Sequence, residues 1–284
     1  MHPKNIHHQP YNFELLCEKH PDLNEFVFIN EHGNQTIHFS DSNAVFHLNK
    51  AILKTHYNIY DWNIPKGYLC PPIPSRADYI HYIADLIDSD KKKEVNGLDI
   101  GVGANCIYSI LGAQIYSWFM VGSDINETAV ITAKQNVAAT PYLSNYINII
   151  HQTNNANIFK GIIQSNEYYD FTLCNPPFFE SEEKALKANK EKTKNLGLNK
   201  KTNYNFGGQA NELWCNGGEA LFIKRMIKQS VEFKNQVNWF TCLVSKVNNL
   251  PKIYKQLNKL QANHKTIEME QGNKKTRFIA WQFN

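Results

Sequence analysis

The segment Leu98-Asp99-Ile100-Gly101-Val102-Gly103-Ala104-Asn105-Cys106 is typical of a buried strand that runs into a glycine-rich turn. Glycine adopts positive φ without a steric penalty and lets the backbone approach a ligand closely. A second strand, Val121-Gly122-Ser123-Asp124, ends in an acid about 20 residues beyond the second glycine, where nucleotide-binding folds place a carboxylate on the ribose hydroxyls. Together the two strands predict a nucleoside site on a parallel α/β sheet.

Cys106 stands where the dinucleotide fingerprint has its third glycine, which disfavours a pyrophosphate and therefore a nicotinamide-dependent oxidoreductase. A nucleoside that carries no phosphate fits best, and S-adenosylmethionine is the obvious candidate. We expect Asp124 to bind its ribose diol, and Gly101 and Gly103 to admit its methionine part. Asp99 is expected to face its amine, directly or through water. Ordinary strand-end or helix-capping roles are the alternative for the two acids.

From Val95 onward, short apolar strands alternate with helices. This order predicts an α/β fold with a mixed, mainly parallel sheet and crossover helices on both faces. The strand candidates are Gly97 to Ile100, Phe119 to Ser123, Ile147 to His151, Phe171 to Cys174, Val237 to Val244 and Arg277 to Phe283.

Two regions are predicted along the chain, an N-terminal accessory region over residues 1–68 and the main domain over 69–284. In the first region, Asp41 is typical of the N-cap of an amphipathic helix. In the second, residues 181–205 hold seven lysines and three glutamates with little apolar periodicity, and they form a predicted basic insertion.

A proline-rich bridge, Leu69 to Arg76, connects the two regions and precedes a helix predicted over residues 78–88. Arg76 is a candidate partner for the cofactor carboxylate. The alternative is an ordinary surface arginine.

The composition excludes several classes of protein. With 42% hydrophobic and 20% charged residues, the 284-residue chain has enough apolar material for a globular core, so it is not a disordered protein. Its formal charge of +4 permits contact with phosphates but does not require it. The six cysteines form no C-x-x-C pair, and no apolar stretch approaches the roughly 18 residues of a membrane span. We therefore expect a cytoplasmic protein without a metal, a disulfide or a membrane anchor.

The segment Asp170-Phe171-Thr172-Leu173-Cys174-Asn175-Pro176-Pro177-Phe178-Phe179 is the most informative in the chain. Its apolar strand ends in Asn175, and Pro176 and Pro177 stiffen the exit and remove two backbone donors. The 6-amino group of adenine is a poor nucleophile because its lone pair is delocalised into the ring. We expect the Asn175 side-chain oxygen and the Pro176 carbonyl to accept both amino hydrogens. Phe178 is expected to stack on the base, a contact worth about 1–3 kcal/mol.

Such a clamp needs no separate strong base, because positioning and transition-state hydrogen bonds supply the rate. The motif suits a planar amide or amine nitrogen as methyl acceptor. DNA adenine and a protein glutamine therefore stay open as alternative substrates. The structural alternative is a strand followed by a proline loop with buried aromatics.

Several segments, in order along nearly the whole chain, closely resemble the ribosomal large-subunit RNA methyltransferase F family. They are Met1-His2-Pro3-Lys4-Asn5, Pro74-Ser75-Arg76-Ala77-Asp78-Tyr79-Ile80-His81, Leu98 to Ala104, Asn175-Pro176-Pro177-Phe178-Phe179, Gly217-Gly218-Glu219 and Trp281. The resemblance implies a Rossmann-like class I S-adenosylmethionine-dependent methyltransferase that makes N(6)-methyladenosine at a single position of 23S ribosomal RNA. Eukaryotic relatives of this family methylate a spliceosomal small nuclear RNA and messenger hairpins.

The resemblance also implies roles for individual residues. Arg76 becomes a cofactor ligand, and the residues from Asn175 to Phe178 become the clamp for the target adenine. The insertion after Phe179 and the stretch Gly217-Gly218-Glu219 become a lid. In one departure, His151 to Asn157 lacks the carboxylate that many related enzymes use to read the cofactor adenine, so an amide or the backbone must make that contact.

The candidate RNA contacts are Lys4 at the start of the chain and Lys274, Lys275 and Arg277 in a basic turn predicted over residues 272–277. The implied partner is 23S ribosomal RNA or a large-subunit precursor, bound by a monomer. Because a stacked base cannot reach Phe178, the target is expected to be single-stranded or in a bulge. The alternative of another class is a noncatalytic RNA-binding or assembly factor with the same fold.

Overall fold

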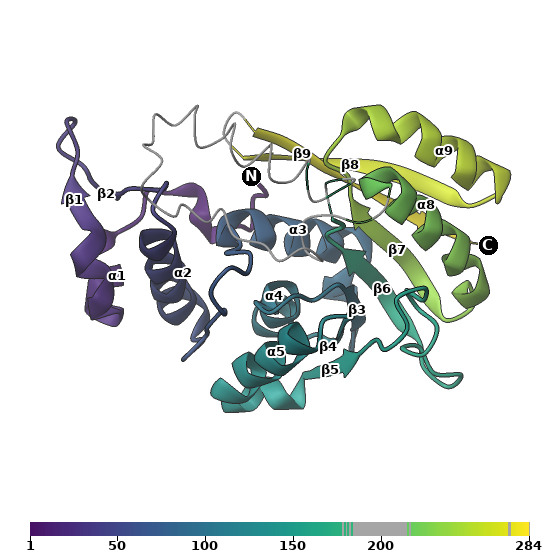
Figure 1. The fold of residues 1–284 in the computed structure, drawn as a ribbon, viewed down its shortest axis with the longest axis horizontal. Helices are drawn as coiled ribbons and strands as arrows, with labels where there is room; N and C mark the ends of the chain where they lie inside the picture. Colours follow the sequence, from purple (N-terminus) through teal and green to yellow (C-terminus); the bar gives the residue numbers. More distant parts are fainter. Residues whose placement is uncertain are drawn as a thin grey trace.

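The computed structural model describes residues 1–177, 179, 181, 183, 215, 217–271 and 274–283. Seven strands form one sheet in the order β5-β4-β3-β6-β7-β9-β8 (Figure 1). They are β3 (Asn96–Ile100), β4 (Phe119–Asp124), β5 (Ile147–His151), β6 (Tyr169–Cys174), β7 (Val237–Leu243), β8 (Asn263–Gln271) and β9 (Lys274–Gln282). The strands from β3 to β7 pair in parallel, and β9 is antiparallel to both of its neighbours. The predicted mixed, mainly parallel sheet is therefore confirmed.

One strand of the sheet, β8, is not predicted by the sequence pattern; it pairs along its whole length with β9. Its apolar residues are Ile267 and Met269, separated by Glu268, so no continuous apolar run marks it. The strand lies at the edge of the sheet, where charged side chains are common because they discourage pairing with other chains.

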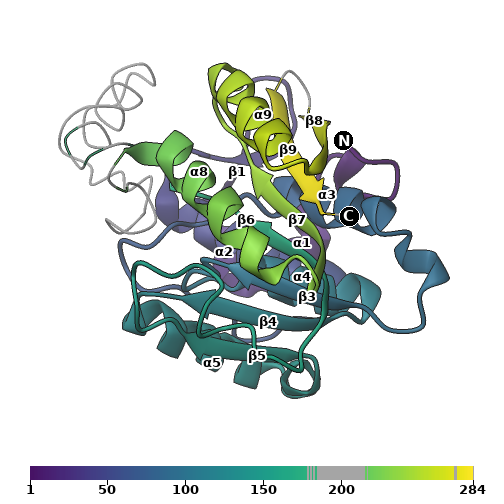
Figure 2. The ribbon, with the colours of Figure 1, turned by 90° about the vertical axis from the view of Figure 1, so that its right-hand side faces the viewer.

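Helices cover both faces of the sheet (Figures 1 and 2). On one face lie α3 (Ile73–Leu86), α4 (Ile107–Tyr116) and α5 (Glu127–Ala139), and on the other lie α8 (Gly218–Ser230) and α9 (Leu250–Lys259). Helix α8 shows why the sequence folds this way. Its apolar residues Ile223, Met226 and Ile227 recur at helical spacing and are fully buried, which leaves the opposite side of the helix to charged residues.

The N-terminal region consists of α1 (Phe13–Lys19), a hairpin of β1 (Val27–Ile29) and β2 (Gln35–Ile37), and α2 (Ser42–Tyr57). As predicted, Asp41 caps α2, since its carboxylate accepts hydrogen bonds from Asn43 N at 2.8 Å and Ala44 N at 3.5 Å. Buried apolar residues form one continuous cluster from Phe13 to the sheet, so this region shares a core with the main domain. Short 3₁₀ turns span Ile6–His8, Pro21–Phe26, Ser89–Lys91, Pro141–Asn145, Val231–Phe233 and Val247–Asn249.

The predicted bridge, Leu69 to Arg76, is too long, because its last residues belong to helix α3. The helix begins at Ile73, five residues earlier than predicted, because Pro74 lies at the start of its first turn, where proline is tolerated. Arg76 therefore projects from a helix. The start of the chain is fixed on the same helix: Asp78 Oδ1 accepts hydrogen bonds from His2 N at 2.9 Å and Asn5 Nδ2 at 2.6 Å.

Among the described residues, no helix combines the length and the apolar composition that a bilayer crossing requires. The predicted basic insertion, residues 181–205, lies outside the described residues except for Ser181 and Glu183.

Candidate active site

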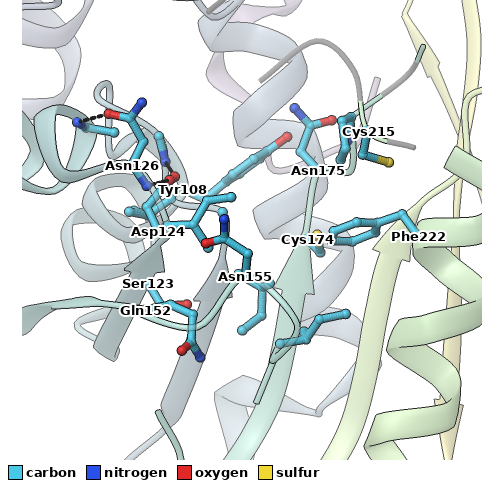
Figure 3. Close-up of a pocket in the computed structure, with 18 of the residues that line it drawn as sticks. Tyr108, Ser123, Asp124, Asn126, Gln152, Asn155, Cys174, Asn175, Cys215 and Phe222 are labelled. Atoms are coloured by element: carbon cyan, nitrogen blue, oxygen red, sulfur yellow. Dashed lines mark hydrogen bonds between the residues drawn. The ribbon is translucent and has the colours of Figure 1, made fainter. Parts of the chain in front are cut away.

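A cavity of about 770 Å³ opens at the carboxyl ends of β3, β4 and β6, where open α/β sheets bind their ligands. Its walls come from the glycine-rich loop after β3, the end of β4, the loop after β5, the exit of β6 and helix α8 (Figure 3). The structure brings most of the predicted site residues together here. Those that line the cavity are Arg76, Gly101, Gly103, Asp124, Asn175 and Pro177.

The glycine-rich loop has the open conformation that the sequence predicts. Gly101 and Gly103 adopt φ of +74° and +64°. A Cβ built at Gly101 would have no heavy atom within 4 Å, so the backbone there borders open space. The loop is fixed to β4, because Gly101 N and Val102 N donate to Ser123 O at 2.8 and 2.9 Å. This cradle fits a ligand that is held close to the backbone.

Cys106, at the third position of the fingerprint, is the N-cap of α4. It adopts φ of +52°, a conformation that favours glycine, and its side chain is fully buried. A cysteine at this position, whose side chain is packed into the core and does not line the cavity, departs from the dinucleotide fingerprint.

Asp124 connects the loop to the next helix. Its Oδ2 accepts a hydrogen bond from Gly103 N at 2.9 Å, and its Oδ1 accepts one from Asn126 N at 2.9 Å. Burial raises the pKa of this carboxyl, and the backbone donors oppose the rise. Each carboxylate oxygen retains acceptor capacity. Asp124 is thus held rigidly at the edge of the cavity, as a ligand of ribose hydroxyls would need to be.

Arg76 is held at the cavity wall by Tyr108, a residue that no sequence motif indicates. The guanidinium Nη1 donates to the Tyr108 hydroxyl at 2.7 Å, and its carbon lies 5.3 Å from the centre of the ring. Burial raises the pKa of Tyr108 to about 12, so the hydroxyl stays protonated. The arrangement offers a fixed cation to a carboxylate.

Asp99 is fully buried and does not line the cavity. Its Oδ2 accepts a hydrogen bond from Ser109 Oγ at 3.2 Å, and its Oδ1 has no partner among the described residues. Burial raises the pKa of this carboxyl to about 7. Its role toward the cofactor amine stays a prediction, and the location of Asp99 favours the route through water.

Asn175 directly follows β6 and stands across the cavity from Asp124 (Figure 3). Its Oδ1 is buried and, within the described part of the chain, accepts no hydrogen bond. A buried acceptor without a partner is rare and destabilising, so it needs an explanation. Pro177 also lines the cavity, Pro176 lies between them, and Phe178 lies outside the described residues.

The loop after β5 supplies amides rather than a carboxylate. Both polar atoms of the Gln152 side chain form hydrogen bonds within the protein: Nε2 donates to Lys160 O at 2.9 Å, and Oε1 accepts from Asn154 N at 3.1 Å. It therefore shapes the loop. Asn155 and Asn157 line the cavity and are the amides available to a ligand. The asparagine-rich sequence indicates that amides could bind a ligand here, but it does not indicate which of them are available.

The stretch Gly217-Gly218-Glu219 opens helix α8. Both glycines adopt positive φ, and the buried Glu219 carboxylate accepts hydrogen bonds from Ser245 N at 2.6 Å, Lys246 N at 3.2 Å and Asn249 Nδ2 at 2.6 Å. These contacts fix the start of α8 to the loop that follows β7. The lid implied for this stretch stays a prediction.

The predicted RNA contacts lie outside the cavity. Lys4 Nζ lies 2.7 Å from the Asp90 carboxylate, and Lys275 Nζ lies 3.1 Å from that of Glu270. The predicted basic turn is wrong for Lys274 and Lys275, which belong to strand β9 because their backbones pair with β8. Arg277, where the last strand is also predicted to begin, lies in β9 as well. Arg277 Nη1 donates to Val244 O at 3.4 Å. Their contacts with RNA stay predictions.

Among the described residues, one group of potential metal ligands comes together, formed by His20, Asp22 and His47 in the N-terminal region. His20 Nε2 and His47 Nδ1 lie 2.8 Å apart and share a proton. The nitrogen that carries this proton has no free lone pair for an ion. The group therefore needs rearrangement to bind a metal, and the expectation that the protein uses none stays a prediction.

Comparison with known proteins decides the family. A family model described as an RNA methyltransferase matches residues 1–284. The chain belongs to this RNA methyltransferase family. It is 60% identical to "Ribosomal RNA large subunit methyltransferase F" of Christiangramia forsetii, over 285 residues that cover all of both chains. It is 48% identical to the protein of the same name from Klebsiella pneumoniae, with all of this chain and 94% of the relative covered.

Solved structures agree with this assignment. The catalytic domain of human METTL16 in complex with MAT2A 3′UTR hairpin 1 is similar with a TM-score of 0.86 and 29% identity, over all of this chain and 96% of that one. The N-terminal domain of human METTL16 in complex with SAH is similar with a TM-score of 0.81 and 27% identity, over all of this chain and 99% of that one. The predicted class I methyltransferase fold and the predicted RNA methyltransferase activity are confirmed.

Proposed function

We propose that this RNA methyltransferase transfers the methyl group of S-adenosylmethionine to the 6-amino group of one adenosine in 23S ribosomal RNA. The observation that carries the proposal is the Asn175 Oδ1, a buried acceptor that borders the cavity and has no partner among the described residues. An unpartnered buried acceptor costs about 1–3 kcal/mol. A substrate amino group in the cavity would satisfy it.

Different residues of the cavity bind different parts of S-adenosylmethionine. Gly101 and Gly103 give the methionine part access to the backbone, Asp124 accepts from the ribose hydroxyls, and Arg76 pairs with the carboxylate. Bound S-adenosylmethionine supplies a methyl group on a positively charged sulfur. Among the described residues that line the cavity, no charged base lies near Asn175, since Asp124 is the one acid there and is held by the glycine-rich loop.

The target nitrogen is oriented by two acceptors. The Asn175 side-chain oxygen and the Pro176 carbonyl take both amino hydrogens, which favours the pyramidal geometry that attack requires. Positioning of this kind lowers the barrier without general-base catalysis. Pro177 keeps the exit of the strand rigid, and Phe178 stacks on the adenine.

Two lines of support favour ribosomal RNA. The chain covers nearly the full length of relatives that are named for the large ribosomal subunit. A similar catalytic domain was solved with an RNA hairpin. The large-subunit precursor as the bound form, the monomeric state and the cytoplasmic location are further predictions of the proposal.

The proposal is tested by mapping N(6)-methyladenosine in 23S ribosomal RNA from cells with the gene, without it, and without it but complemented by the Asn175→Ala variant. We expect one adenosine whose methylation depends on the gene and is absent with the variant. A 23S methylation map that is the same in all three strains would refute the proposal.

Radiolabelled methyl transfer to total RNA, DNA and protein separates the alternatives. Label in DNA or protein alone would favour adenine in DNA or a glutamine side chain as substrate. Equal function of the wild type and the Asn175→Ala variant in ribosome assembly, with no label in any fraction, would favour a noncatalytic assembly factor.

A further inference from the structure

Helix α8 forms a positively charged border along one side of the cavity. Lys224, Arg225 and Lys228 all line it, and all three side chains are exposed. Among the described residues that line the cavity, Asp124 is the one acid, and it lies on the opposite wall. We call the three α8 cations the α8 ledge. The described walls of the cavity therefore carry more positive than negative charge.

The lysines of the α8 ledge differ in their partners from two of the predicted RNA contacts. Lys4 and Lys275 pair with Asp90 and Glu270. Within the ranges that the structure describes, Lys224 and Lys228 form no ion pair. An exposed lysine without a carboxylate keeps its full charge for a ligand, because no neighbour screens it.

The helix that carries the ledge is fixed in place. Its inner face is fully buried, and Glu219 fastens its first turn to the loop after β7. In its middle, Gln256 of α9 donates to Lys224 O at 2.8 Å. Lys224 and Lys228 are four residues apart, so they lie on the same side of the helix, about 6 Å from each other along its axis. The charges therefore form a short rigid row beside the cavity.

In the described part of the chain, two lysines without ion pairs and one arginine border a cavity that has a single acid, an arrangement that fits a polyanion entering the same cavity. We propose that the α8 ledge binds backbone phosphates of the RNA strand next to the target adenosine, and this inference rests on the proposed function. Phosphate contacts of this kind supply affinity and register, whereas the clamp around Asn175 identifies the base. Helix α8 thus guides the single strand toward Asn175.

The test measures binding of a fluorescein-labelled, unstructured 20-nucleotide RNA, oligouridine with one central adenosine, as a function of salt. The variants are Lys224→Gln, Lys228→Gln and both together. The control is the double variant Lys93→Gln with Lys134→Gln, because these exposed lysines do not line the cavity. Lys93 precedes β3 at the amino ends of the parallel strands, whereas the cavity lies at their carboxyl ends. The ledge double variant and the control double variant each lose two positive charges, so their net charges are equal.

For single-stranded RNA, each lost phosphate contact lowers the slope of log K against log salt by about 0.7. We expect a reduction of about 0.7 for each ledge variant and about 1.4 for the double variant, with no reduction in the control. Affinity for S-adenosylmethionine, measured by calorimetry, should be unchanged in all of them.

A wild-type slope in the ledge double variant would overturn the proposal, as would an equal reduction in the control. In the latter case, net charge alone explains the effect. Suppose that one 23S adenosine is methylated only when the gene is present, but the salt slopes of the ledge variants equal that of the wild type. This result would overturn RNA binding by the α8 ledge and leave the proposed function standing. The reverse result, reduced slopes without a methylated adenosine, would refute the proposed function and keep the ledge as an RNA-binding surface. Failure of the wild type to bind the RNA would overturn the ledge outright.

Discussion

The Asn175→Ala substitution is expected to change catalysis and stability in opposite directions. The Asn175 Oδ1 is buried without a partner among the described residues, so its removal relieves a desolvation cost of about 1–3 kcal/mol. Part of that gain is offset by the lost packing of the side chain. We therefore expect the free energy of unfolding to stay the same or to rise by about 1 kcal/mol.

The effect on the rate is expected to be large. Loss of one hydrogen-bonding group that is oriented toward the transition state typically lowers kcat by about 10²–10³, or about 2.7–4 kcal/mol. The variant should lose at least this factor in single-turnover transfer of a tritiated methyl group to 23S ribosomal RNA. Affinity for S-adenosylmethionine, measured by calorimetry, should stay within about threefold, because Asp124, Arg76 and the glycine-rich loop remain.

A matched control is available three residues earlier, on β6. Thr172 Oγ1 is also buried without a partner, and the side chain does not line the cavity. Thr172→Val should therefore raise the free energy of unfolding in urea in the same way, with no loss of rate. The reasoning is refuted if Asn175→Ala lowers the rate less than tenfold, or if it destabilises the protein by 2 kcal/mol or more.

Three further predictions concern the cofactor cradle. Asp124→Ala removes the acceptor of the Gly103 and Asn126 amides, so calorimetry should find S-adenosylmethionine bound about 10- to 100-fold more weakly; affinity within threefold of the wild type would contradict this. Gly101→Ala places a Cβ at positive φ and into the cavity. It should weaken cofactor binding and lower the free energy of unfolding in urea by about 1–2 kcal/mol. An unchanged affinity for S-adenosylmethionine would show that the cradle is elsewhere. Burial raises the pKa of Asp99 from 3.8 to about 7, so the folded protein holds a proton that the unfolded chain releases. The free energy of unfolding of the ligand-free protein should fall by up to about 4 kcal/mol between pH 4 and pH 7, and Asp99→Asn should remove that component; identical pH profiles would contradict the assignment.

The parallel sheet could be predicted because its strands are short apolar runs that end in recognisable turns. Six of the seven strands were found in this way. The edge strand β8 was missed because its charged residues interrupt the apolar pattern. The start of α3 was placed too late because Pro74 is a helix breaker in most positions but not in the first turn.

The site was predictable where local sequence determines the geometry. Gly101, Gly103, Asp124 and Asn175 follow directly from strand ends, and all of them line one cavity. Contacts between distant parts of the chain could not be predicted. The Tyr108 hydroxyl that holds Arg76 is one example, and the pairing of Lys4 with Asp90 is another, since no local pattern specifies which side chains meet in the folded chain.

The central claim is that Asn175 holds the target nitrogen against the methyl group of the donor. It is tested most directly by a crystal structure of the protein soaked with S-adenosylmethionine, in which the distance from the donor methyl carbon to Asn175 Oδ1 is measured. Since the amino nitrogen must contact both atoms, we predict a methyl group that points toward Asn175 and lies within about 6 Å of that oxygen. A donor that binds outside this cavity, or whose methyl group is separated from Asn175 by protein atoms, would contradict the claim.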